Sequence, residues 1–283
     1  MNNKWNSFLV AIFVAFTGLP VVLGFGYAAL YSIGLVGILN QGWNFQHWIQ
    51  TLTSTEAIAA LGFSLYVATA TIIIAIGSAL FVTLNMRKEI QRKWFSTILY
   101  FPLAIPAVVA AFFTFQLLSN AGLFSRIIFY SGWIKSVQEF PDIINDRFGV
   151  GIIATHIMMS LPFFTIVFSN LFEAEKLEEL QRVARTLGAT SAQADLKIAV
   201  PILLRRAFPA IVLYFFFVFG SYEIPLLLGR QFPQMISVLM IRKLQRFNLL
   251  DIPTAYTLAI LYLIIAGTVI LLLFRKRKLA YDV

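Results

Sequence analysis

The sequence predicts an all-α integral membrane protein with six transmembrane helices. Hydrophobic residues make up 59% of the 283-residue chain and charged residues only 12%, whereas soluble domains average roughly 45–50% apolar and about 25% charged. Six separate stretches each contain the ~20 mostly apolar residues that a helix needs to cross the hydrocarbon core. Backbone groups in lipid have no water to bond, so these stretches must be helices rather than open strands.

The expected spans follow one another with polar connections between them. The first begins near the N-terminus, and its apolar run continues through Leu30, which is longer than the core of a signal peptide. We therefore expect a retained span there. The six expected spans are Phe8–Leu30, Ala57–Leu84, Phe95–Leu118, Val150–Phe172, Ala207–Leu228 and Ala255–Phe274.

The distribution of basic residues predicts that the N-terminus and the C-terminus both lie inside the cell. Cytoplasmic segments of membrane proteins are enriched in lysine and arginine. With the N-terminus inside, 15 of the 22 lysine and arginine residues fall in the expected inner segments. Anionic lipid of the inner leaflet would attract these residues. The net charge of +9 therefore indicates a partner lipid bilayer and no nucleic acid.

One membrane domain is expected to cover most of the chain. Residues 1–56 should hold the first span and an outer loop, 57–274 the transmembrane core, and 275–283 a basic cytoplasmic tail. No internal repeat is visible, which favours one subunit of a pore completed by a second chain over a self-contained carrier. Three outer segments are either interfacial connections or contacts with an external protein: 42–55, 120–148 and 229–254.

The longest expected cytoplasmic segment, about residues 173–206, has the local signals of a compact helical knob. Its first helix should carry acidic residues in the early turns and Arg182 and Arg185 near the end, an order that suits the helix dipole. The acidic residues are Glu173, Glu175, Glu178 and Glu179. One apolar stripe follows helical spacing and comprises Leu177, Leu180, Val183, Ala184 and Leu187.

Three further signals in this segment predict where its helices end and begin. Gly188 stands where a left-handed C-cap requires glycine. Thr190 and Gln193 form a capping box for a second, shorter helix, which Pro201 is expected to stop. The alternative is an ordinary solvated loop whose amphipathic helix rests on the bilayer.

Residues 182–201 resemble the EAA motif of type I ABC importer permeases. The separate first span and the SYEIPLLLG end of the fifth span, residues 221–229, are most similar to the polyamine, ferric-iron and phosphonate branch of that family. The EAA motif runs Glu-Ala-Ala, three residues, Gly, nine residues, Ile, one residue, Leu-Pro. Its alanine, glycine, isoleucine and proline match Ala184, Gly188, Ile198 and Pro201, whereas Arg182, Val183 and Val200 depart from it. The place of the segment, between the fourth and fifth of six spans, is also similar to the family, and the resemblance extends over nearly the whole chain.

The resemblance implies that this segment is a coupling helix, which seats on a cytoplasmic ATP-binding subunit. It also implies a second permease subunit, identical or different, an extracytoplasmic solute-binding protein, and a place in the bacterial cytoplasmic (inner) membrane. The chain has no G-x-x-x-x-G-K-[ST] loop, so a partner chain would bind the ATP and this chain needs no cofactor. The residues expected to couple to the ATPase are Arg182, Val183, Ala184, Gly188, Ile198 and Pro201.

Glu223 is the one acidic residue well inside an expected span, and such a residue is by default a functional hypothesis. Pro225 should kink or end the helix nearby. We take Glu223, Tyr222 and His156 as candidates for the substrate pathway, and Glu223 suits a polyamine-like cation. The alternatives are that Glu223 lies at a helix end, and that His156 is hydrogen-bonded to a neighbouring helix.

Other classes of function have little support in the sequence. Cysteine is absent and the two histidines, His47 and His156, are far apart, which excludes a thiolate or histidine metal cluster. Neither H-E-x-x-H nor a serine nucleophile elbow is present. A transport permease is therefore favoured over an ion-coupled carrier or channel subunit, and over a membrane-embedded enzyme.

Overall fold

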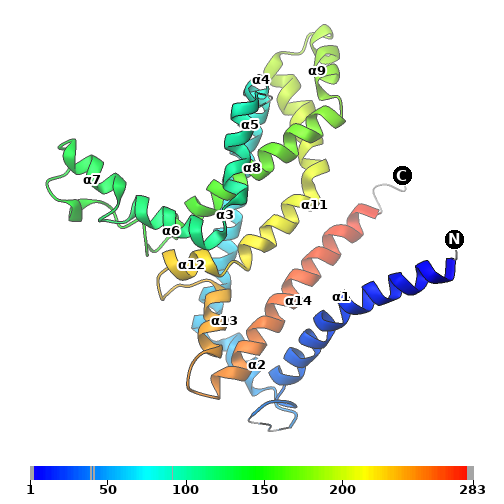
Figure 1. The fold of residues 1–283 in the computed structure, drawn as a ribbon, viewed down its shortest axis with the longest axis vertical. Coiled ribbons are helices and arrows are strands. Elements are labelled where there is room, and N and C mark those ends of the chain that lie inside the picture. Colours follow the sequence, from blue (N-terminus) through cyan, green and yellow to red (C-terminus); the bar gives the residue numbers. More distant parts are fainter. Residues whose placement is uncertain (1–2, 39, 41, 91, 279–283) are drawn as a thin grey trace. The chain divides into compact units, whose positions relative to one another are not determined.

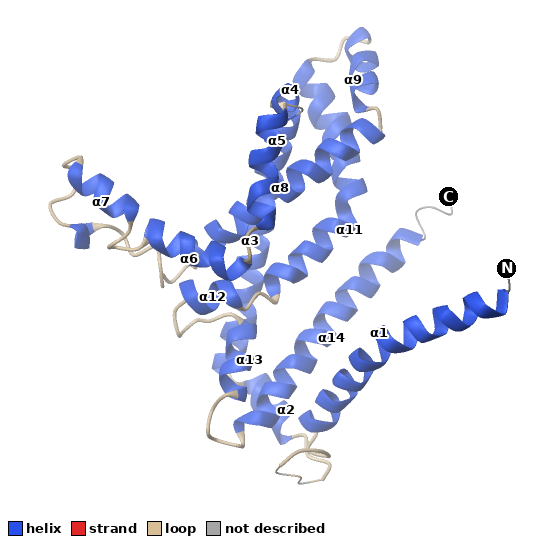
Figure 2. Cartoon of the chain, in the orientation of Figure 1, coloured by secondary structure: helices blue, strands red, loops and turns tan. Residues whose placement is uncertain are grey.

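A computed structural model describes residues 3–38, 40, 42–90 and 92–278, and contains helices and loops without a strand among these residues (Figures 1 and 2). Six helical stretches are long and apolar enough to cross a membrane, which confirms the expected fold class. They are Ser7–Ser32, Thr55–Asn85, Ala107–Tyr130, Val150–Ala174, Ser191–Phe219 and Asp251–Leu273. Residues 279–283 of the expected basic tail lie outside the described residues.

The chain divides into two compact units. Unit 1 combines the chain up to Ala60 with the chain from Ile236 onward, and unit 2 is Leu61–Met235. Unit 1 contains α1 (Asn3–Ser32), α2 (Gln46–Thr53), the first residues of α3 (Thr55–Asn85), α13 (Ile236–Leu244) and α14 (Asp251–Lys278). Within it, α14 packs against α1, α2 and α13.

Polar and aromatic side chains tie the helices of unit 1 together. The Trp48 Nε1–H donates to Ser32 Oγ at 3.3 Å, which joins α2 to the end of α1. The rings of Tyr31 and Tyr256 stack with centroids 4.5 Å apart, which joins α1 to α14. Lys243 on α13 forms ion pairs of 3.4 Å with both Glu56 and Asp251. These contacts join the five helices α1, α2, α3, α13 and α14.

Unit 2 holds the remainder of α3 and the elements up to α12. They are α4 (Arg87–Ile90), α5 (Lys93–Tyr100), η1 (Phe101–Ala104), α6 (Ala107–Leu118), α7 (Leu123–Tyr130), η2 (Val137–Glu139), α8 (Val150–Ala174), α9 (Leu177–Thr186), α10 (Ser191–Ala194), η3 (Asp195–Ala199), α11 (Val200–Phe219) and α12 (Glu223–Leu228). The α4 and α9 helices lie at the same end of this unit (Figure 1).

The core of unit 2 is built where three helical segments each present a buried residue every four positions. Helix α8 contributes three phenylalanines, α3 contributes two alanines, and the stretch from the end of η3 into α11 contributes alanine, leucine and alanine in turn. The residues are Phe164, Phe168 and Phe172; Ala75 and Ala79; and Ala199, Leu203 and Ala207. Small residues let helix backbones approach closely in membranes, so the alanines make room for the rings.

The third expected span, Phe95–Leu118, is wrong in its position. Helix α5 and η1 precede a break, and the apolar stretch begins at Ala107 and continues to Tyr130. The break has a local cause, because the residue before a proline is pushed out of the α region. Ile105, which precedes Pro106, has extended backbone angles of φ −85° and ψ 125°.

The fifth expected span, Ala207–Leu228, is also wrong at its end. Helix α11 ends at Phe219, and Gly220 to Tyr222 separate it from the six-residue helix α12. Pro225 lies in the first turn of α12, where a proline removes a donor that would have no partner within the helix. Glu223 is the first residue of α12, so it lies beside a helix break rather than inside a span.

Candidate functional site: a capped helical knob between α8 and α11

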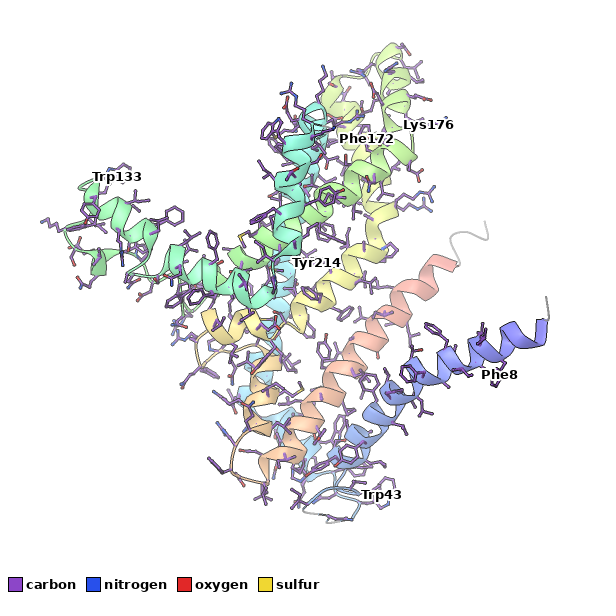
Figure 3. All side chains as sticks on the ribbon, viewed as in Figure 1. Phe8, Trp43, Trp133, Phe172, Lys176 and Tyr214 are labelled. Atoms are coloured by element: carbon purple, nitrogen blue, oxygen red, sulfur yellow. The ribbon has the colours of Figure 1, made fainter. Side chains whose placement is uncertain are left out.

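Residues 175–199 form the knob, which begins with a sharp elbow at Lys176. The α8 helix ends at Ala174, and Lys176 adopts a left-handed conformation with φ +48° before α9 begins at Leu177. Figure 3 shows Lys176 beyond the end of α8, with Phe172 preceding it. The expectation that Glu173 and Glu175 occupy early turns of the knob helix is therefore wrong, because both precede the elbow. Of the acidic residues, Glu178 and Glu179 lie in the first turn of α9.

The C-terminal end of α9 is closed by backbone hydrogen bonds around Gly188. Gly188 has φ +91°, its N–H donates to Arg185 O at 3.0 Å, and the Ala189 N–H donates to Ala184 O at 3.0 Å. These two bonds are the 5→2 and 6→1 bonds of a Schellman motif, which satisfy carbonyls that would otherwise be unpaired at a helix end. The glycine cap predicted from the sequence is confirmed.

The second helix of the knob starts at the predicted capping box. The Gln193 N–H donates to Thr190 Oγ1 at 3.2 Å, and the Thr190 N–H donates to Gln193 Oε1 at 2.9 Å. Two backbone donors at the start of α10 are therefore satisfied reciprocally. The path of the chain between α9 and α10 is fixed by a Schellman motif on one side and this box on the other.

Pro201 does not stop the second helix, and this part of the prediction is wrong. Asp195–Ala199 form a π-helical turn, and the Val200 N–H donates to Asp195 O, five residues back. The wider turn accommodates the proline, which lacks an N–H and would crowd the carbonyl four residues before it in an α-helix. Ser191–Phe219 are consequently continuous as one helical stretch of 29 residues.

Arg87, the first residue of α4, fastens the knob to that helix, a role that no sequence pattern predicted. Its guanidinium lies 3.8 Å from the centroid of the Phe172 ring and 3.3 Å from Glu178 Oε2. Glu178 in turn accepts a hydrogen bond of 2.9 Å from Arg182. Because Arg87 and Glu178 are 91 positions apart, no local pattern in the sequence could have paired them.

Two further polar contacts brace the knob, one within it and one to α11. The Gln181 amide donates to Asp195 Oδ1 at 2.5 Å, which ties α9 to the π turn. The Arg206 guanidinium approaches Glu175 with two of its nitrogens, at 2.7 and 3.2 Å. Such two-pronged arginine–carboxylate contacts fix orientation as well as distance. The knob is therefore a braced body rather than a flexible loop.

The knob leaves most of its apolar stripe uncovered. Leu177 is fully buried in the core, but Leu180 is exposed, Val183 is 57% exposed and Leu187 is 84% exposed. Leu196, on the π turn, is exposed as well. A rigid helix with uncovered apolar side chains is the form that helix-in-groove recognition requires.

The residues predicted to couple are spread over the outer surface of the knob and its connection to α11. Arg182, Val183 and Ala184 lie on α9, with Arg182 68% exposed and Ala184 half-buried. Gly188 forms the turn between the two helices of the knob. Ile198 is half-buried in the π turn and Pro201 lies in the first turn of α11.

The acid and base on α9 support each other electrostatically. The hydrogen bond from Arg182, followed by the charge of Arg87, lowers the pKa of Glu178 below its usual value. The same hydrogen bond raises the pKa of Arg182. Arg182 therefore stays charged at the surface, at the position where the EAA motif has a glutamate.

The three candidate pathway residues differ in their surroundings. Glu223 is exposed at the start of α12, and its carboxylate forms no ion pair among the described residues. Tyr222 is half-buried beside it. His156 is fully buried in α8, and neither of its ring nitrogens has a hydrogen-bond partner in the described part of the chain. The expected hydrogen bond from His156 to a neighbouring helix is therefore absent there.

A threonine pair bonds α8 to α6 instead. Thr155 Oγ1 donates to Thr114 Oγ1 at 2.9 Å, and both side chains are buried. Thr155 directly precedes His156 on α8. The hydrogen bond from this part of α8 to a neighbouring helix is therefore made by Thr155.

The chain is similar to known transport proteins in sequence and in fold. Residues 71–277 match the family described as binding-protein-dependent transport system inner membrane component. No curated protein sequence matches the chain. One similar structure is that of a bacterial ABC transporter involved in the import of the acidic polysaccharide alginate. The TM-score is 0.68 with 18% sequence identity, over 98% of this chain and 99% of that chain.

A second similar structure is the bacterial alginate ABC transporter in complex with an alginate pentasaccharide-bound periplasmic protein. It has a TM-score of 0.68 and 18% sequence identity, over 96% of each chain. At 18% identity the structural similarity shows a shared fold alone. The family match covers well over half of this chain and therefore shows the family. The family consists of transport subunits, so the enzyme alternative and the ion-coupled carrier or channel are both set aside.

Proposed function

The chain belongs to the family of binding-protein-dependent transport system inner membrane components, the multi-pass permeases of ABC importers, and we propose that residues 182–201 couple it to a cytoplasmic ATP-binding subunit. The observation that carries this proposal is the uncovered apolar stripe on a braced knob. Leu180, Val183 and Leu187 project from α9 without a partner in the chain's own core. Exposing apolar side chains to water is unfavourable in free energy. Burial of these side chains in a groove of a partner protein would remove that unfavourable term.

The connection between the knob and the membrane supports the same proposal. Ser191–Phe219 are one helical stretch, so a displacement of α10 must move α11 as well. Arg87 and Arg206 link the knob to α4 and α11 through Glu178 and Glu175. A partner that pushed on the knob would therefore move several helices of unit 2 together, as a device driven by ATP requires.

The proposed assembly has the partners that an ABC importer needs. The chain has no nucleotide-binding loop of its own, so the ATP belongs to the partner subunits. A second permease chain, identical or different, would complete the translocation pathway, and an extracytoplasmic binding protein would deliver the solute. The alginate transporter forms a complex with an alginate pentasaccharide-bound periplasmic protein, which supports a partner of this kind. This arrangement requires the knob to lie in the cytoplasm, as the distribution of basic residues predicts.

Leu187→Ser tests the coupling proposal. Leu187 is 84% exposed, so the substitution removes no packing within the chain and should leave its thermal unfolding unchanged. We expect the variant to lose co-purification with the ATP-binding subunit, or the stimulation of ATP hydrolysis in the complex. Phe247→Ser is a matched control, because Phe247 is fully exposed in the loop before α14 and should leave this assembly intact. Equal assembly and equal ATP hydrolysis in both variants would rule out docking through this stripe.

For the transported solute we propose a small organic cation of the polyamine class. Support comes from Glu223, an exposed carboxylate without an ion-pair partner among the described residues, placed at a helix break in unit 2. Glu223→Gln should then lower uptake of a polyamine without changing assembly with the ATPase. A partner binding protein that binds acidic oligosaccharides and no polyamine would refute this assignment and leave the coupling proposal untouched.

A further inference from the structure

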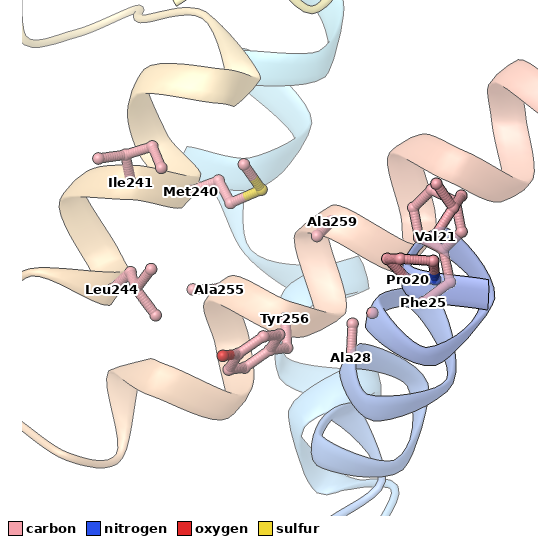
Figure 4. Close-up of a pocket in the computed structure, with 11 residues that line it drawn as sticks. Pro20, Val21, Phe25, Ala28, Met240, Ile241, Leu244, Ala255, Tyr256 and Ala259 are labelled. Atoms are coloured by element: carbon pink, nitrogen blue, oxygen red, sulfur yellow. The ribbon is translucent and has the colours of Figure 1, made fainter. Parts of the chain in front are cut away.

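Unit 1 contains an apolar cavity between α1, α13 and α14, with a volume of about 390 Å³ (Figure 4). Each of the three helices supplies part of the wall. The lining residues are Pro20, Val21, Gly24, Phe25 and Ala28 from α1, Met240, Ile241 and Leu244 from α13, and Ala255, Tyr256 and Ala259 from α14. The knob and the candidate pathway residues lie in unit 2, so this cavity belongs to neither.

The cavity exists because small residues face one another across it. Gly24 and Ala28 on α1, and Ala255 and Ala259 on α14, leave space that larger side chains would fill. A side chain added at Gly24 would meet no atom within 4 Å of its Cβ. The contacts of Tyr256 with Tyr27 and Tyr31 keep α1 and α14 together beside this space, so the helices do not collapse onto it.

The lining selects a hydrocarbon occupant. Apart from the Tyr256 hydroxyl, the lining side chains are apolar, so the cavity offers few hydrogen-bonding groups and favours contact with an apolar molecule. The volume lies within the range of small-molecule sites, roughly 300–1,000 Å³. A helix from another chain is about 10–12 Å wide with its side chains, which is too wide to enter a space of this size. A single flexible alkyl chain fits it.

Charged side chains mark one end of the cavity. Asp251 lies one helical turn before Ala255 on α14 and pairs with Lys243 and Arg246 at 3.4 Å each. Glu56 pairs with Arg242 and Lys243. Three cations thus meet two carboxylates. One positive charge remains in excess in this group, and Arg246 is 45% exposed.

The combination of an apolar cavity and a nearby excess cation matches an amphipathic anion. We propose that the cavity binds one acyl chain of a glycerophospholipid, whose phosphate lies beside Arg246 at the α13–α14 end. The buried acyl chain covers the apolar lining of the cavity, and the negative phosphate balances the excess positive charge of the side-chain cluster. This site is independent of the coupling role of the knob.

Gly24→Leu tests the proposal by filling the cavity from α1. Gly26→Leu is the matched control, because Gly26 also has no atom within 4 Å of an added Cβ but does not line the cavity. The full chain would be purified from membranes containing phosphatidylglycerol with a photoactivatable group on its acyl chain. After illumination, peptide mapping would locate the lipid adducts. We expect adducts on the lining segments of the wild type and the control, and their loss in Gly24→Leu.

A second pair of variants keeps the test decisive if Gly24→Leu does not fold. Ala259→Leu fills the same space from α14, and Arg246→Gln should reduce the adduct from phosphatidylglycerol by removing the excess cation. Equal adducts in the wild type and both cavity-filling variants would overturn the proposal. So would a photoactivatable residue at Val21 that cross-links to a polypeptide rather than to lipid, because a protein partner would then occupy the cavity.

Discussion

Gly188 permits a sharp test of how the knob is held in shape. Its φ of +91° is a conformation that residues with a side chain rarely adopt, and a Cβ at this position would meet no atom within 4 Å. Any effect of a substitution therefore comes from the backbone and not from a steric clash. Left-handed conformations cost ordinary residues roughly 1–2 kcal/mol. Asparagine tolerates them better, and β-branched residues tolerate them worst.

These costs translate into a measurable change in local order. A penalty of about 1–2 kcal/mol reduces the ratio of ordered to opened knob by a factor of roughly 5–30. The amides of Gly188 and Ala189, which donate to Arg185 O and Ala184 O, should exchange with deuterium faster by a similar factor. We expect the effect to increase from Gly188→Asn through Gly188→Ala to Gly188→Val. Under the coupling proposal, the apparent affinity for the ATP-binding subunit should fall in the same order, because only an ordered knob would be competent to bind.

Gly77→Ala supplies the control for this series. Gly77 is exposed within α3, has no atom within 4 Å of an added Cβ, and does not have a positive φ. Alanine there should stabilise the helix by about 0.5–1 kcal/mol and leave exchange in the knob unchanged. Two results would refute the reasoning: a valine at position 188 with wild-type exchange, or an asparagine that is as disruptive as valine.

Two further predictions follow from the polar groups of unit 2. Because the pKa of Glu178 is lowered in the folded state, its contribution to stability is present above its ordinary pKa of 4.5 and is lost as the pH falls through the lowered value. Protection of the α9 amides, measured relative to their intrinsic exchange rates at each pH, should therefore fall in that acidic range, and Glu178→Gln should remove this dependence. His156→Leu should not lower thermal stability, and should raise it by about 1 kcal/mol, because neither nitrogen of the buried imidazole has a hydrogen-bond partner among the described residues. A clear drop in the unfolding temperature of His156→Leu would contradict this prediction.

Short-range signals in the sequence predicted the local geometry of the knob well. The glycine cap at Gly188 and the capping box of Thr190 and Gln193 depend on residues within a few positions of one another. Their physics is therefore contained in a short stretch of sequence. The number of apolar stretches was predictable for a similar reason, since the length of a span depends on bilayer thickness and composition alone.

Features that depend on distant partners or on unusual backbone could not be predicted. The left-handed elbow is occupied by Lys176, a residue type without a preference for that conformation. Arg87 belongs to the expected inner segment after the second span, where the sequence distinguishes it in no way from its basic neighbours, yet it stacks on Phe172 and pairs with Glu178. Composition placed Arg87 near the membrane surface, but only the packing of α8 and α9 brings these three side chains together.

The prolines show how one rule can hold at one position and fail at another. At Pro106 the preceding residue is extended and the third span is broken there, as the rule predicts. At Pro201 the chain stays helical, because a π turn at Asp195–Ala199 supplies the extra room. A proline stop would have placed a hinge between the knob and the membrane, and a push on the knob would then be absorbed at that hinge. The observed stretch from Ser191 to Phe219 has 29 residues, roughly 40 Å of helix at 1.5 Å per residue. Since it includes α10 at one end and reaches the break before Glu223 at the other, a displacement of the docked knob must reach that break.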